Sequence, residues 1–136
     1  GGGAWLDRVR MRVAAVPADP AELSGPLLGG SFGDLVVSRR VNQRRDRVRA
    51  RKSLRCAAAE YVQIADGKMD FALFSKLMPW DHAAGVLLHA EAGGFAARLD
   101  RRRYRAGDTP AGEPLLLAPN AETWALIRRE VIGEPD

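Results

Sequence analysis

Strand-like and helix-like segments alternate along this chain, and this alternation limits its possible folds more than any other feature. The expected strands are short and apolar, whereas the expected helices repeat their apolar residues every three or four positions. The strands fall at 9–16, 26–32, 49–55, 69–77, 94–100 and 114–119, and the helices at 35–45, 56–67, 82–92 and 120–133. This order predicts an α/β domain with a layered α-β-α arrangement.

Two of these helices carry clear end signals. Asn120 is the expected N-cap of the last helix and Gly133 its expected stop, while Gly67 is the expected stop of the helix at 56–67. The residues expected to face inward are Ala58, Tyr61, Val62 and Ala65 in the earlier helix and Trp124, Ile127 and Val131 in the last one.

The length of the chain suits one domain. Its 136 residues are 46% hydrophobic, so we expect a single core and a single domain over residues 1–136. The one cysteine, Cys56, cannot form an internal disulfide, and we expect it to be buried packing. No apolar run approaches the roughly 20 residues of a membrane helix, and the start does not resemble a signal peptide. The expected location is cytoplasmic.

Positive charge is concentrated in one block. Residues 38–55 carry eight Arg and one Lys against one Asp, a net charge of +8, whereas the whole chain carries +4. Such a block can bind nucleic acid, but no aromatic residues interleave with the arginines, as binding to single strands would require. The favoured interpretation is a solvated surface or one that meets acidic groups. A nucleic-acid-binding module using residues 39–55 is kept as an alternative.

The segment MPWDHAAGVLLHAEAGG, residues 78–94, places an aspartate at the mouth of a helix. Pro79 should keep Met78 extended, Trp80 should anchor in the wall, and Asp81 should be the N-cap. The residues expected on the buried face of this helix are Ala83, Val86, Leu87 and Ala90, and Gly93 or Gly94 should end it.

Small residues follow Asp81, and they leave the first helical turn uncrowded. Gly85 needs a reason, because glycine inside a helix costs about 1 kcal/mol relative to alanine. A close approach of a ligand or of neighbouring backbone would supply that reason. The free amides and dipole of such a turn attract anions, and Asp81 at its edge can hold a hard cation, so that both grip a phosphate.

This segment resembles the C-terminal signature of the inositol monophosphatase family, written W-D-x-A-A-G followed by E-A-G-G. The matching residues are Trp80, Asp81, Ala83, Ala84, Gly85, Glu91, Ala92, Gly93 and Gly94. Three further stretches resemble the family in the same order: GGGAWL with VRMRVA, KSLRCAAAEYVQIADGKMDFAL, and LLLAPNAETWALI. The likeness covers nearly the whole chain.

The resemblance implies the C-terminal half of a sugar-phosphatase-like fold, a mixed sheet flanked by helices, in a Mg2+-dependent phosphomonoesterase. It implies that Asp81 ligates a catalytic Mg2+ and that Ala83, Ala84 and Gly85 lie beside the phosphate of a small phosphorylated metabolite. Lys52 and Ser53 are expected to face the phosphate cleft. Family members often form dimers, so a homodimer is also expected.

Part of the family pattern does not occur in this sequence. The other metal ligands of the family, an upstream Glu and a D-P-x-D-G-T segment, belong to an N-terminal metal-binding domain that is absent from this chain. We therefore expect the 136 residues alone to be inert or nearly so. A domain that binds a phosphorylated ligand without turning it over is the alternative.

Two departures concern the substrate. Phe74 stands where inositol-specific relatives commonly have a carboxylate, and Arg55 stands where the family often has glycine. An inositol phosphate, a sugar phosphate, histidinol phosphate and a nucleotide-type phosphate such as 3′-phosphoadenosine 5′-phosphate all stay open. His82 and His89 lie seven residues apart on the helix and are expected to be surface or hydrogen-bonded histidines and not metal ligands.

Overall fold

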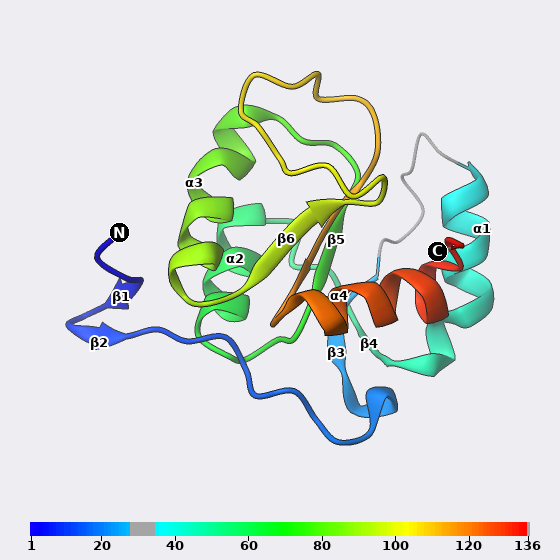
Figure 1. Ribbon diagram of the computed structural model, residues 1–136, viewed down its shortest axis with the longest axis horizontal. Helices are drawn as coiled ribbons and strands as arrows, with labels where there is room; N and C mark the ends of the chain where they lie inside the picture. The colour runs from blue at the N-terminus through cyan, green and yellow to red at the C-terminus, as the bar shows by residue number, and fades with distance from the viewer. Residues whose placement is uncertain (28–34, 136) are drawn as a thin grey trace.

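The computed structural model describes residues 1–27 and 35–135, and a three-stranded sheet lies at its centre (Figure 1). Strand β7 (Leu115–Ala118) pairs antiparallel with β5 (Ala72–Phe74) on one side and with β6 (Phe95–Arg98) on the other. Strands β5 and β6 therefore run in the same direction and end at the same edge of the sheet.

A parallel pair of strands, β3 (Ser24–Pro26) and β4 (Arg49–Arg51), adjoins the start of β5. The amides of Asp70 and Phe71 donate to the Ser24 carbonyl oxygen at 2.8 and 3.4 Å. In return, the Ser24 amide donates to Asp70 Oδ2 at 2.7 Å. These bonds join parallel and antiparallel strands side by side, as expected for a mixed sheet.

Helices cover both faces of the sheet (Figure 1). On one face lie α2 (Ala57–Ala65) and α3 (Pro79–Glu91), and on the other lie α1 (Leu35–Arg44) and α4 (Ala121–Ile127), which continues into a π-helical turn, η3 (Arg128–Ile132). The remaining short elements are β1 (Trp5–Leu6), β2 (Val9–Arg10), η1 (Pro20–Glu22) and η2 (Arg45–Arg47).

Strand β7 shows why this sequence needs two layers of helices. Leu116 and Ala118 belong to the core beneath α1 and α4, whereas Leu115 and Leu117 belong to the core beneath α2 and α3. All four side chains are fully buried. A strand whose successive residues are all apolar must be covered on both faces, and the layered α-β-α prediction is confirmed.

Most expected elements occur near their predicted positions, with shorter strands. The strand expected at 9–16 is wrong in extent, because only Val9 and Arg10 pair with β1. The Met11 amide still donates to the Ala4 carbonyl oxygen, but the Val13 amide donates to the carbonyl oxygen of Ala92 at the end of α3. The strand expected at 26–32 lies mostly outside the described residues.

The last helix follows its sequence signals, whereas α2 departs from them. Asn120 Oδ1 accepts from the Thr123 amide at 2.8 Å, and Gly133 has φ +74°. The residues expected to face inward from the last helix, Trp124, Ile127 and Val131, are buried as predicted. In α2 the buried residues are Glu60, Tyr61, Ile64 and Ala65, so the prediction was wrong for Ala58 and Val62. Cys56 is exposed and not buried, because it precedes the first turn of α2.

Helix α3 begins earlier than expected. Met78 is the N-cap, with ψ 130°, and Pro79 is the first helical residue, a position that proline favours because its missing N–H costs nothing there. Asp81 is therefore not the cap but a first-turn residue, whose amide donates to the Met78 carbonyl oxygen at 3.0 Å. Trp80 is 76% exposed and does not anchor in the core.

The buried side of α3 also differs from the predicted one. Leu87 is 62% exposed and Ala90 is exposed, whereas His82 and His89 are buried. Gly85 explains the difference, because α3 packs against α2 there. A Cβ at Gly85 would overlap the Tyr61 ring. The missing side chain lets the two helices approach closely.

Among the described residues, no helix is long and apolar enough to cross a membrane.

His89 ties α3 to the sheet. Its Nε2 lies 3.0 Å from the Ala118 carbonyl oxygen and 3.3 Å from that of Phe95. Because both partners are acceptors, Nε2 carries the proton. The ring is fully buried, and burial lowers the pKa of His89 below its ordinary value of 6.5. His89 is therefore neutral and structural.

The free energy of unfolding is expected to fall as the pH drops below about 6.5. The unfolded chain then binds a proton at His89, whereas the folded chain, with its lowered pKa, does not. Urea denaturation at about pH 8 and about pH 5.5 measures this change. The variant His89→Gln keeps a donor and cannot titrate, so it should lose part of the pH dependence. An unchanged dependence in that variant would contradict the assignment.

Candidate functional site

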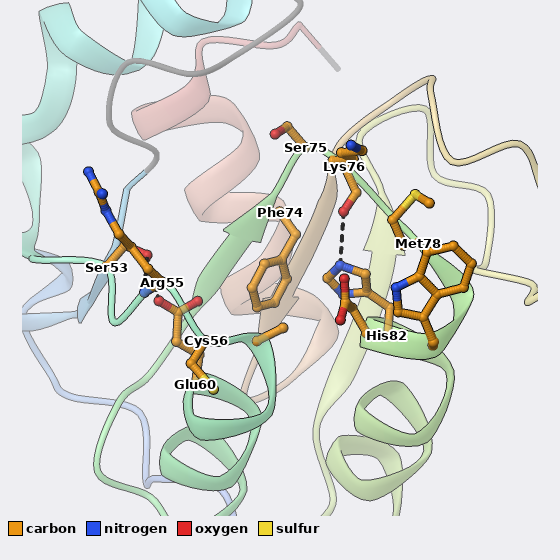
Figure 2. Close-up of a pocket in the computed structure, with 12 residues that line it drawn as sticks. Ser53, Arg55, Cys56, Glu60, Phe74, Ser75, Lys76, Met78 and His82 are labelled. Carbon is orange, nitrogen blue, oxygen red and sulfur yellow. Dashed lines mark hydrogen bonds between the residues drawn. The ribbon is translucent and has the colours of Figure 1, made fainter.

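A pocket of about 550 Å3 opens where α2 and α3 begin, beside the end of β5 (Figure 2). The residues that line it come from the segment before α2, from α2, from the end of β5 and from the start of α3. They are Ser53, Arg55, Cys56, Ala57, Glu60, Phe74, Ser75, Lys76, Met78, Trp80, Asp81 and His82. The motif around Asp81 therefore meets residues that are 20 to 30 positions earlier in the sequence.

Phe74 and His82 line the pocket and pack with the Tyr61 ring. Phe74 lies 5.2 Å from Tyr61, with an angle of 22° between the ring planes, and 4.8 Å from His82 at 64°. Both arrangements are favourable for aromatic pairs. The Phe74 ring is thus fixed between α2 and α3.

His82 connects these rings to the loop before α3. Its Nε2 lies 2.9 Å from the Lys76 carbonyl oxygen, and its Nδ1 lies 3.0 Å from the Tyr61 hydroxyl. The carbonyl can only accept, so Nε2 donates, and Nδ1 accepts from Tyr61. Burial lowers the pKa of His82 and raises the pKa of Tyr61. The expected hydrogen-bonded histidine is confirmed, and it positions the Lys76 loop.

Glu60 is a charged side chain that the sequence interpretation missed. It is only 4% exposed, and its Oε1 accepts from Ser53 Oγ and from the Leu54 amide, both at 2.8 Å. These bonds hold the segment before α2 against the first turn of that helix. The signal in the sequence was a lone acidic residue next to the apolar stripe of α2.

Arg55 lines the pocket in a backbone conformation that suits glycine. Its φ is +53°, in the left-handed region that costs a residue with a side chain about 1 kcal/mol. The structure thus explains why glycine suits this position, where the present residue is an arginine that lines the pocket. Lys52 is exposed but is not among the lining residues, unlike its neighbour Ser53.

The small residues after Asp81 lie away from the pocket lining. Ala84 is exposed, Ala83 is half-buried, and Gly85 contacts Tyr61. The close approach that Gly85 permits is therefore made by a neighbouring side chain. Contact of these three residues with a phosphate stays a prediction.

Asp81 offers one oxygen ligand of the type that hard cations prefer. Its side chain is exposed at the pocket and makes no hydrogen bond or ion pair within the described part of the chain. Across residues 1–27 and 35–135, no group of three or more His, Cys, Asp or Glu side chains is arranged to hold a metal ion. Asp81 can therefore supply one ligand to a divalent cation, but the described residues do not form a complete metal site.

Several arginines of the basic block contact acidic groups of the same chain. Arg40 pairs with Glu134 and Arg47 with Glu130, both at 2.8 Å, and Arg49 pairs with Glu22 at 3.2 Å. This arrangement supports the interpretation of the block as a surface that meets acidic groups.

The structure is thus an α/β domain in which two carboxylates, Glu60 and Asp81, and two cationic side chains, Arg55 and Lys76, line one pocket at the starts of two helices. Comparison with known proteins gives the family. The model of the inositol monophosphatase family matches residues 1–131, and the chain belongs to this family.

Curated relatives support the assignment. The chain is 38% identical over 104 residues to an inositol-1-monophosphatase of Mesorhizobium japonicum, covering 74% of this chain and 38% of that protein. It is 32% identical over 139 aligned positions to an inositol-1-monophosphatase of Rhizobium meliloti, covering 99% of this chain and 49% of that protein. The chain thus spans about half, or less, of the length of these relatives.

Solved structures share the fold. Inositol monophosphatase II of Staphylococcus aureus superposes with a TM-score of 0.79 at 17% identity, over 96% of this chain and 47% of that chain. An inositol monophosphatase of Thermotoga maritima superposes with a TM-score of 0.69 at 24% identity, over 96% of this chain and 46% of that chain. The fold is therefore that of inositol monophosphatases.

Proposed function

We propose that this chain forms the substrate-binding part of a phosphomonoesterase that hydrolyses a small phosphorylated metabolite with the help of Mg2+. One observation carries the proposal: the exposed Asp81 carboxylate lies in the first turn of α3, at a pocket that Ser53, Arg55 and Lys76 also line. Family membership supports the phosphatase chemistry.

Four residues of the pocket have a task in this proposal. Asp81 would hold a divalent cation, which when bound polarises a phosphoryl oxygen and lowers the pKa of a bound water. Arg55 and Lys76 offset the negative charge of the phosphate. The neutral His82 holds the Lys76 carbonyl oxygen and keeps the loop before α3 in place.

One carboxylate does not complete the coordination of Mg2+. The proposal therefore takes the other oxygen ligands from the substrate phosphate and from polypeptide that corresponds to the other part of the relatives. The exposed side chains of Trp5, Leu6 and Val9 in the hairpin and of Leu87 on α3 are the apolar surface on which such polypeptide would pack.

The test is an assay of phosphate release in two settings. The chain alone, with Mg2+ and p-nitrophenyl phosphate, is expected to show little or no turnover. A chimera that joins it to the first half of the Rhizobium meliloti relative is expected to show Mg2+-dependent turnover. A folded chimera that binds Mg2+ but releases no phosphate would refute the proposal.

Replacing Arg55 by glycine is expected to separate stability from ligand binding. Glycine adopts the left-handed backbone conformation of position 55 without strain, so the midpoint of thermal unfolding should stay the same or rise. Affinity for inorganic phosphate should fall about threefold, because an exposed positive charge leaves the pocket. Isothermal titration and thermal denaturation give the two quantities.

Arg8 provides the matched control, since it also has a positive φ, +67°, but lies in the N-terminal hairpin region. The variant Arg8→Gly should keep phosphate affinity unchanged. Equal losses of affinity in the two variants would show that Arg55 has no particular role in the pocket.

A further inference from the structure

The Phe74 face of the pocket offers carbon and no hydrogen-bonding group. Phe74 is packed against Tyr61 and His82, so its ring cannot turn aside without breaking both contacts. The polar atoms behind it are already used, because Tyr61 donates to His82 and His82 donates to the Lys76 carbonyl oxygen. A ligand hydroxyl placed against this face would lose its bonds to water without replacement.

Further apolar side chains come from the start of α3. Met78 and Trp80 line the same pocket, and Trp80 is 76% exposed. In Figure 2, Phe74 and Met78 lie on either side of the His82 ring. A tryptophan has only two side-chain torsions to fix and a large flat face, so it binds another flat ring at low entropic cost.

The charged side chains of the pocket complement this apolar part. Arg55 and Lys76 are exposed and line the same pocket, as does Asp81. The pocket therefore combines cations suited to a phosphate with an aromatic and thioether surface suited to a flat apolar group. A polyol phosphate uses only the first of these two features.

From this combination we infer that the pocket takes phosphate monoesters that carry an aromatic or heteroaromatic ring, with the ring against Phe74, Met78 and Trp80. The inference rests on the proposed function for the phosphate half of the ligand. It selects ring-bearing esters over polyol phosphates.

Three small ligands separate the two halves of the pocket on the 136-residue chain at constant Mg2+. Benzyl phosphate has a ring and a phosphate, methyl phosphate has only the phosphate, and benzyl alcohol has only the ring. Dissociation constants come from NMR titrations of the amides of Ser53, Arg55 and Lys76. Benzyl phosphate is expected to bind roughly tenfold more tightly than methyl phosphate, the size of effect that aromatic contacts give.

The variant Trp80→Ala removes an exposed side chain and should not disturb folding. It is expected to remove most of the difference in affinity between benzyl phosphate and methyl phosphate, and to leave the affinity for methyl phosphate unchanged. Leu87→Ala is the matched control, because Leu87 is an exposed apolar residue of the same helix that does not line the pocket. This control should keep the full preference.

The outcomes distinguish the two proposals. Equal affinities for benzyl and methyl phosphate, or equal losses in Trp80→Ala and Leu87→Ala, would overturn the ring inference and leave the proposed function standing. Tight binding of myo-inositol 1-phosphate, equal to that of benzyl phosphate, would also overturn it. Benzyl alcohol binding as tightly as benzyl phosphate would refute the phosphate half and hence the proposed function.

Discussion

Replacing Asp81 by Asn in the active chimera is expected to lower Mg2+-dependent phosphate release by at least about a hundredfold. The amide keeps the size of the side chain but loses the negative charge that a hard cation requires. Asp81 is exposed in the first turn of α3, so folding should change little. Steady-state rates at several Mg2+ concentrations measure the loss.

Glu122 offers a control for the electrostatic effect of a first-turn carboxylate. It is the acidic residue in the first turn of α4, and it does not line the pocket. Both Asp81→Asn and Glu122→Gln should lower stability by about 0.5 kcal/mol through the helix dipole. Only Asp81→Asn should lower activity. If Glu122→Gln lost as much activity, the effect of Asp81 would be one of folding and not of cation binding.

Replacing Gly85 by Val is expected to lower the free energy of unfolding by about 3 kcal/mol, the upper part of the range for overpacking. A Cβ at this position would overlap carbon atoms of the Tyr61 ring, and that ring is held by Phe74 and His82. The contact between α2 and α3 would have to open, and the pocket between their first turns would change shape. Urea denaturation followed by circular dichroism gives the change.

The neighbouring position supplies the control for this substitution. Ala84 is exposed on the same helix, so Ala84→Val should cost only the lower helix propensity of valine, about 0.6 kcal/mol. Gly85→Ala should lie between the two valine variants, because its gain in helix propensity opposes the overlap. Equal effects of valine at positions 84 and 85 would mean that the helices do not pack closely at Gly85.

The order of strands and helices could be predicted because each element carries a local pattern. The all-apolar run at Leu115–Ala118 and the cap signals at Asn120 and Gly133 do not depend on distant residues. The same holds for the place of the pocket, because the Asp81 motif opens a helix whose start lies at the end of a strand. These parts of the fold follow from short-range rules.

The inner faces of α2 and α3 could not be predicted in the same way. A count of apolar residues placed Leu87 inward, but the structure buries His82 and His89 instead. Their burial depends on acceptors outside the helix: the Lys76 carbonyl oxygen in the loop before α3 for His82, and the Ala118 carbonyl oxygen at the end of β7 for His89. Glu60 is similar, because its place inside is stabilised by donors of the segment before α2. Such tertiary partners leave no periodic signal.

The predicted site residues were also only partly placed at the pocket. Of the residues named from the family resemblance, Asp81, Phe74 and Ser53 line the pocket, whereas Lys52, Ala83, Ala84 and Gly85 do not. The prediction could not separate Gly85 as a packing residue from Gly85 as a ligand contact, because both require the absence of a side chain. The position of the Tyr61 ring shows that Gly85 is a packing residue, whereas its contact with a ligand stays a prediction.

The most direct test of the central claim is the position of a bound divalent cation on the chain itself. Mn2+, which accepts the same oxygen ligands as Mg2+, broadens the NMR signals of nearby nuclei. With inorganic phosphate present, the amides of His82, Lys76 and Arg55 should broaden in the unmodified chain, and this broadening should be lost in Asp81→Asn. Unchanged broadening of these amides in Asp81→Asn would contradict the role of Asp81 as the cation ligand.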